Sequence, residues 1–134
     1  MPTIERIIPV LTYEDIQAGH DFLVNVLGFT SGVVDRDGGG TPVHAEVRAG
    51  GQAIWLHRVT REHAMASPRT APTASGVVVM VDDVDAHHAR AAAAGADIEA
   101  EPADMPYGQR EYGIRDPEGH RWWFASLIPA QTTG

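Results

Sequence analysis

Residues 107–124 read YGQREYGIRDPEGHRWWF, and this stretch decides the fold class. Its centre, Asp116-Pro117-Glu118-Gly119, has the composition of a tight β-turn, because proline presets one backbone angle and glycine tolerates a left-handed one. The residues on either side predict two strands, at about 111–115 and 121–126. The stretch therefore predicts two strands joined by a turn, with the pair Trp122 and Trp123 on the second strand.

The residues before this stretch predict the rest of a small α+β module. Residues 76–81 form a β-branched run that is typical of a strand. Asp82 and Asp83 follow it and suit a helix N-terminus, and the alanine-rich stretch after them ends at Gly95. A further strand is expected near Ile98.

The first half of the chain shows the same order of elements. Residues 4–11 predict a strand, and apolar residues at helical spacing after Ile16 predict a helix that stops at Gly28. Three strands are expected at about 29–35, 43–49 and 52–59, with glycine-containing turns at 37–40 and 50–51.

Adding one constant number to the residue numbers of the first half aligns it with the second half. It takes Asp15 to Asp83, Gly51 to Gly119, Trp55 to Trp123 and Leu56 to Phe124, and it takes Gly28 to the residue after Gly95. We therefore predict one domain, residues 1–134, built from two βαβββ modules at about 4–59 and 76–127, with a linker at about 60–75.

The composition excludes several classes of protein. The chain has 134 residues, a net charge of −8 from 10 Lys+Arg and 18 Asp+Glu, and no cysteine. The absence of cysteine excludes disulfide scaffolds, thiolate metal sites and cysteine nucleophiles. Because the excess negative charge repels phosphate, we expect no nucleic-acid partner, and the lack of a long apolar run predicts no membrane span. The expected location is the cytoplasm.

Two stretches resemble a known family. Residues 107–124 resemble the C-terminal signature of the vicinal oxygen chelate superfamily, which includes glyoxalase I, extradiol dioxygenases, and fosfomycin- and bleomycin-resistance proteins. Residues 15–29, which end Val26-Leu27-Gly28-Phe29, resemble its first helix. The resemblance implies an α+β fold in which two βαβββ modules form a cup-shaped half-barrel with the ligand inside. It also implies a homodimer.

The resemblance further implies where enzymes of the superfamily hold a divalent metal. One ligand comes from the first strand and one from the last strand of each module, and these positions fall on Ile8, Val77, Trp55 and Trp123. None of these side chains has a lone pair for a metal ion. A shift of one position brings in no histidine or carboxylate, so we predict no metal and no cofactor. An atypical site that uses His44, Glu46 and His57 stays open as an alternative.

The same positions predict a ligand-binding interior. Trp55 and Trp123 are expected to face into the cup, either as an aromatic platform for a ligand or as packing that fills it. Trp122 is expected to point the other way, toward the helices. The further ligand-binding candidates are the wall residues Ile8 and Val77 and the polar or aromatic residues His57, Arg121, Tyr107, Arg110 and Tyr112. Arg110 has the alternative of pairing with a surface carboxylate.

We therefore expect metal-independent binding and sequestration of an aromatic or amphipathic small molecule, such as an antibiotic, as in bleomycin-resistance proteins. The acidic surface favours a cationic ligand. The alternative is a glyoxalase-like lyase or isomerase, or a dioxygenase, that uses a divalent metal or His57 as a base. A third possibility is a cup that is filled by its own side chains and serves only dimerisation.

Overall fold

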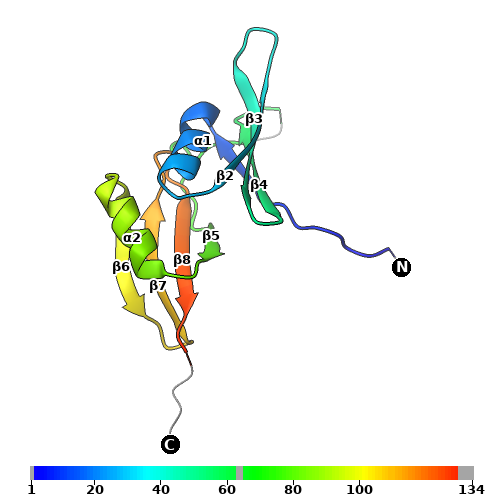
Figure 1. Ribbon diagram of the computed structural model, residues 1–134. Coiled ribbons are helices and arrows are strands. Elements are labelled where there is room, and N and C mark those ends of the chain that lie inside the picture. Colours follow the sequence, from blue (N-terminus) through cyan, green and yellow to red (C-terminus); the bar gives the residue numbers. More distant parts are fainter. Residues whose placement is uncertain (1, 63–64, 130–134) are drawn as a thin grey trace, which may run out of the picture. The chain divides into compact units, whose positions relative to one another are not determined.

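The structure is a computed structural model that describes residues 2–62 and 65–129. It divides the chain into two compact units, Met1–Pro72 and Thr73–Gly134, and each contains one helix and one four-stranded sheet (Figure 1). The boundary falls inside the linker expected at 60–75, of which residues 63 and 64 lie outside the described part. In the described residues no helix is long and apolar enough to cross a membrane.

The first unit has one helix between its first and second strands. Its strand order is β1-β4-β3-β2, in which β1 runs parallel to β4 and the other pairs are antiparallel. Its elements are β1 (Val10–Tyr13), α1 (Ile16–Asn25), β2 (Thr30–Arg36), β3 (Pro42–Ala49) and β4 (Gln52–Arg58).

The second unit repeats this arrangement. Its strand order is β5-β8-β7-β6, again with one parallel pair, β5 with β8, at the edge. Its elements are β5 (Gly76–Met80), α2 (Val84–Ala93), β6 (Asp97–Asp104), β7 (Gln109–Arg115) and β8 (Arg121–Leu127). The predicted α+β fold with two βαβββ modules is confirmed.

The first strand begins later than the sequence pattern indicated. We expected it at 4–11, but β1 spans Val10–Tyr13, and Ile4 and Ile7 are exposed. Only the later residues pair with β4, and Tyr13 is fully buried, with its ring lying where a Cβ on Gly19 of α1 would be. Because a strand needs a hydrogen-bonded neighbour, β-branched composition alone places no strand at residues 4–9.

The two helices begin at equivalent N-caps, and each is followed by a glycine with a positive φ. Asp15 and Asp83 are the N-caps, and each carboxylate accepts a hydrogen bond of 3.0 Å from a backbone N–H in the first turn. Gly28 and Gly95 follow the helices with φ values of 87° and 83°, which glycine adopts without strain. The offset that superposes the caps takes Gly28 to Ala96 instead of Gly95, so the repeat slips by one position after the helix.

The N-cap of α2 is testable with a neighbouring control. We expect Asp83→Ala to lower the free energy of unfolding by about 1 kcal/mol, because the Ala86 N–H loses its acceptor. Asp82 is exposed and precedes the cap, so Asp82→Ala should change it by less than about 0.5 kcal/mol. Urea unfolding of both variants measures the difference. Equal losses would assign the effect to charge near the helix dipole rather than to the cap.

Each helix packs on one face of its own sheet, and that face forms the unit's core. Helix α1 packs on β3 and β4, and α2 packs on β6, β7 and β8. Trp122 is 0% exposed, and strand alternation places it beside Phe124, whose ring stacks on His87 of α2. The predicted direction of Trp122 is therefore confirmed. The fully buried large side chains on these faces are Tyr13, Val47 and Leu56 in the first unit, and Tyr112, Ile114, Trp122 and Phe124 in the second.

Candidate functional site

The face of each sheet on which that unit's helix does not pack is called its open face. Strand register and alternation place the residues of each face. The open face of the first unit carries Val10, Thr12, Asp35, His44, Glu46, Trp55 and His57. The open face of the second unit carries Gly76, Val78, Met80, Glu111, Gly113, Arg121, Trp123 and Leu127.

On the second unit, the indole of Trp123 lies across the sheet over two glycines. A Cβ on Gly76 of β5 would overlap its Cζ3 atom, and a Cβ on Gly113 of β7 would come within 3.1 Å of its Nε1 atom. The two ends of the ring system therefore rest on the strands at either side of β8. Side chains at both neighbouring positions would lift the ring, so the glycines allow it to lie along the backbone.

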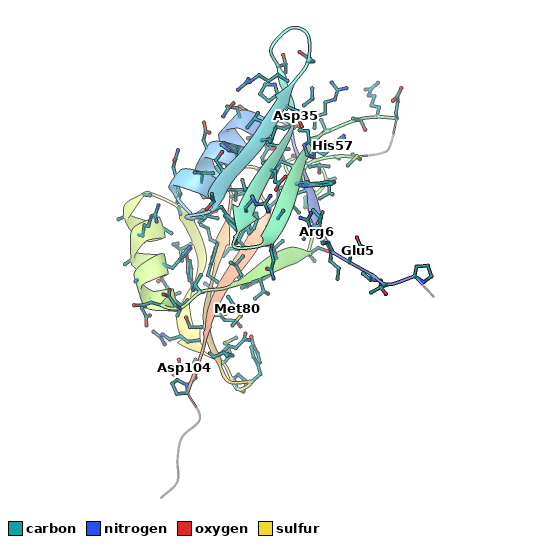
Figure 2. The ribbon with its side chains drawn as sticks, turned by 45° about the vertical axis from the view of Figure 1, so that its right-hand side comes forward. Glu5, Arg6, Asp35, His57, Met80 and Asp104 are labelled. Carbon is teal, nitrogen blue, oxygen red and sulfur yellow. The ribbon has the colours of Figure 1, made fainter. Side chains whose placement is uncertain are left out.

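Exposed apolar side chains lie on the same face as this indole. Val78, Met80 and Leu127 are 55%, 49% and 73% exposed, and they lie on the same face as Trp123. Figure 2 labels Met80 at the end of β5. Tyr107 is also exposed, and its hydroxyl donates to the Glu111 carboxylate on this face. Exposed apolar residues that gather in this way mark interaction sites in proteins.

Two arginines share one carboxylate beside the indole. Arg115 of β7 and Arg121 of β8 are opposite each other in the register, and Glu99 of β6 lies near both. The Arg115 Nε is 2.5 Å from the Glu99 carboxylate, whereas the Arg121 Nε is 3.7 Å from it. The open face of the second unit thus combines an aromatic surface with arginine side chains and carboxylates, since Glu111 and Asp97, which is opposite Arg115, lie on the same face.

Two predicted ligand-binding residues lie on the other face. Arg110 pairs with Asp85 of α2 at 3.1 Å and with Asp104 of β6 at 3.1 Å. Tyr112 is buried, its hydroxyl is 2.6 Å from the His87 Nδ1, and burial raises its pKa so that the phenol stays neutral. The expectation that these residues reach the cup is wrong, because even positions of β7 face α2. Arg110 takes the alternative of a carboxylate pair.

On the first unit, Trp55 has polar neighbours instead of glycines. It lies opposite Val10 of β1 and Glu46 of β3, and the His44 ring meets it edge-on with centroids 5.4 Å apart. His57 of β4 is on the same face, and its ring centroid is 6.5 Å from that of His44. Figure 2 labels His57 together with Asp35 of β2, whose carboxylate is 3.3 Å from the His44 Nδ1. This indole lies among carboxylates and imidazoles.

The hydrogen bond of His57 defines its tautomer. Its Nδ1 is 2.7 Å from the backbone carbonyl oxygen of Arg58. A carbonyl oxygen only accepts, so Nδ1 must carry the proton and donate it. In the neutral ring the lone pair then resides on Nε2, which makes this atom the acceptor or base of the group.

The first-strand positions predicted for the ligand need correction. Val10 lies opposite Trp55, and Val78 lies opposite Trp123. Ile8 precedes β1, and Val77 lies opposite the buried Trp122, so it faces the helix side. The residues that flank the two indoles are therefore Val10 in place of Ile8 and Val78 in place of Val77.

The donor chemistry of these positions does not fit a metal ion. The corrected first-strand residues are valines and the last-strand residues are tryptophans, and none of them offers a lone pair to a metal. Of the atypical set His44, Glu46 and His57, Glu46 is paired with Arg48 at 2.6 Å. Across residues 2–62 and 65–129, no group of three or more histidines and carboxylates is placed to hold a metal.

The structure also contains a hollow that sequence reasoning missed. It measures about 440 Å³ and lies between Glu14, residues 59–61 and the segment 65–70 of the first unit. The segment is held against the end of β1 by a hydrogen bond from the Thr12 hydroxyl to the Ala66 carbonyl and by the Arg69–Glu14 pair. No periodic pattern marks such a loop, because its position depends on single long-range contacts.

Comparison with known proteins shows which family and which solved structures this chain is similar to. The family model of the Glyoxalase/Bleomycin resistance protein/Dioxygenase superfamily matches residues 4–124. No curated protein sequence matches at the significance required. Among solved structures, the chain is similar to TioX from Micromonospora sp. ML1, with 37% identity, 92% of this chain and 99% of that chain covered, and a TM-score of 0.76.

Two further structures are similar at lower identity. One is TnmS3, an antibiotic binding protein from Streptomyces sp. CB03234, with 23% identity, 95% and 98% of the two chains covered, and a TM-score of 0.73. The other is the bleomycin-binding protein from bleomycin-producing Streptomyces verticillus, complexed with copper(II)-bleomycin. It has 24% identity, 97% and 100% coverage, and a TM-score of 0.66. At these identities the similarity shows a shared fold.

Proposed function

The chain belongs to the Glyoxalase/Bleomycin resistance protein/Dioxygenase superfamily, and from that premise we propose that it binds and sequesters an aromatic or amphipathic small molecule without using a metal. An antibiotic is the ligand type that fits this role best. Two of the similar structures are described as an antibiotic binding protein and a bleomycin-binding protein, which supports this choice. Because one fold hosts many activities, the argument depends on the site itself.

The observation that carries the proposal is the position of the Trp123 indole over Gly76 and Gly113. A ring that lies along the sheet presents its other flank to the open face, where a planar ligand can stack on it. Val78 lies opposite Trp123, and Met80 and Leu127 add exposed apolar surface on the same face. A mostly apolar surface with a few polar groups is typical of small-molecule sites.

Trp55 supplies a second aromatic surface of different polarity. Its neighbours Glu46 and Asp35 are carboxylates, and His44 and His57 are on the same face. This surface suits a polar or cationic ligand group, whereas the Trp123 surface suits a planar apolar one. Trp55 and Trp123 therefore both belong to the proposed ligand-binding residues, together with His57, Arg121 and Tyr107.

The test follows the three indole N–H signals by NMR while bleomycin and a panel of polycyclic aromatic antibiotics are added. We expect a ligand that binds to shift the Trp55 or Trp123 signal and to leave the buried Trp122 signal in place. Trp123→Ala should weaken the binding of that ligand by about thirtyfold, since stacking and apolar burial each contribute about 1 kcal/mol, or about 2 kcal/mol together. Chelator treatment should leave the affinity unchanged.

The control for this experiment is Tyr13→Phe, which alters a fully buried ring on the helix face of the first unit. Its ligand affinity should equal that of the unaltered protein. A panel that leaves every indole signal unchanged and gives no heat of binding would reject the proposed function.

A catalytic role is the second candidate, and the His57 tautomer favours it. The Nδ1 hydrogen bond to the Arg58 carbonyl leaves the lone pair on Nε2 to accept a proton, as a general base must. A lyase or isomerase that uses this base should lose its activity in the variant His57→Gln. Turnover of any bound ligand, followed by mass spectrometry, separates this candidate from sequestration.

The proposal also includes the cellular location and the oligomeric state of the protein. We expect the protein to work in the cytoplasm and to form a homodimer, as the resemblance implies. Light scattering of the purified chain measures its mass in solution and decides the second point.

A further inference from the structure

We infer that Arg121 binds an anionic group, a carboxylate or phenolate, on the planar ligand that stacks on Trp123. This inference rests on the proposed function and names the ligand class: an aromatic acid, or a ring system that carries an acidic hydroxyl. It depends on the hydrogen bonds, position and charge of the arginine pair on the open face of the second unit.

Arg121 lacks the hydrogen bonds that comparable arginines make. Its side chain is 31% exposed, and its Nε is buried with no hydrogen-bond partner in the described part of the chain. Arg110 and Arg115, two other partly buried arginines of the unit, each donate to two acceptors. A ligand cannot reach the buried Nε, but the terminal N–H groups of this partly exposed side chain can donate to an acceptor that a ligand supplies.

The ion pair that Arg121 makes in the described part of the chain is a long one. Arg115 and Arg121 are directly opposite on β7 and β8, where like charges repel. Glu99 is the carboxylate near both, and it lies 2.5 Å from Arg115 but 3.7 Å from Arg121. Glu99 therefore pairs closely with Arg115 and more distantly with Arg121. An anionic group on a ligand would therefore pair with Arg121 more closely than Glu99 does.

Arg121 lies where a substituent of a stacked ring can reach it. It precedes Trp123 by two positions on β8, so both side chains project from the open face about 7 Å apart along the strand. Gly76 lies against both residues, because a Cβ there would come within 3.1 Å of the Arg121 Cβ and would overlap the Trp123 ring. The glycine thus leaves room for the indole and the arginine stem side by side.

Arg121 places a positive group near Trp123 on a chain whose net charge is negative. A net charge of −8 favours cationic ligands at long range. Salt screens exposed charges beyond about 8 Å, so a ligand stacked on Trp123 responds mainly to the charges beside it, and Arg121 is one of these. A planar guanidinium also matches a carboxylate through two parallel hydrogen bonds, which gives geometric selectivity.

The test compares two matched probes on the full chain: 2-naphthoate and its neutral analogue 2-naphthamide. Titration is followed by the Trp123 indole N–H signal and by calorimetry. We expect naphthoate to bind at least tenfold more tightly than naphthamide. Arg121→Gln should reduce that preference to less than threefold while the naphthamide affinity stays within twofold. Arg110→Gln, which removes an arginine from the helix face, should keep the full preference.

A second variant is expected to raise the naphthoate affinity instead of lowering it, which a general loss of structure would not do. Glu99→Gln removes the competing carboxylate, so it should raise the naphthoate affinity about three- to tenfold and leave naphthamide unaffected. Equal binding of the two probes to the unaltered protein would overturn the anion site and leave the proposed function intact. No binding of either probe at millimolar concentration would overturn the inference together with the Trp123 platform on which it rests.

Discussion

Replacement of Trp122 by alanine is expected to lower the free energy of unfolding by about 4 kcal/mol. The Trp122 side chain is 0% exposed, lies on the helix face of β8, and donates its indole N–H to the Asp116 carboxylate at 3.2 Å. The substitution removes the largest fully buried side chain of the chain's described part and leaves a cavity between sheet and helix. A loss of this size is a large share of the roughly 5–15 kcal/mol that stabilises a typical domain.

The adjacent tryptophan is the matched control for this experiment. Trp123→Ala removes a side chain of the same size from the open face, where it is partly exposed, so we expect a loss below about 1.5 kcal/mol. Trp122→Phe keeps most of the buried volume and should stay folded even where the alanine variant does not. Urea unfolding, followed by circular dichroism, measures all three. Similar losses for the two alanine variants would show that both indoles belong to the core.

Replacement of Asp116 by alanine is expected to cost about 3 kcal/mol, because it leaves several donors without their acceptor. The Asp116 carboxylate is buried in the turn before β8. Its Oδ1 accepts hydrogen bonds of 3.0 Å from the backbone N–H groups of Glu118 and His120, and its Oδ2 accepts from Trp122. Each buried unsatisfied donor costs about 1–3 kcal/mol. The same unfolding measurement gives the loss.

An asparagine variant distinguishes the hydrogen bonds of the two carboxylate oxygens. Asp116→Asn keeps one acceptor for the backbone N–H groups but turns an amide N–H₂ toward the indole N–H of Trp122, so two donors face each other. We expect a loss of about 1–2 kcal/mol. In the double variant with Trp122→Phe the clash disappears, so the combined loss should be smaller than the sum of the single losses. Additive losses would contradict the assigned bond.

Local signals predicted most of the elements. The helices begin after Asp15 and Asp83 and are followed by Gly28 and Gly95, because capping and left-handed backbone are properties of a few neighbouring residues. The turn at Asp116 was predicted for the same reason. The first strand was misplaced because its limits depend on pairing with β4, which is distant in the sequence and separated from it by a helix and two strands.

The faces of the strands were harder to predict than the strands. Arg110 and Tyr112 were assigned to the ligand side, although Tyr112 and Ile114 alternate as the apolar residues of β7 and mark the helix face. That signal was present in the sequence. Nothing comparable marks Val78 rather than Val77 as the neighbour of Trp123, since every residue from 77 to 79 is a valine. Nor does the sequence show that two glycines lie under one indole.

By itself the sequence determined the two modules, their helix limits, their turns and the equivalence of Trp55 and Trp123. These features depend on contacts between residues close in the chain, or on a repeat that can be read directly. Only the tertiary structure decided which residues share a face with each indole and which arginine N–H lacks a hydrogen-bond partner in the described part of the chain. The physical reason is that side chains alternate along a strand, so a shift of one position in register exchanges its two faces.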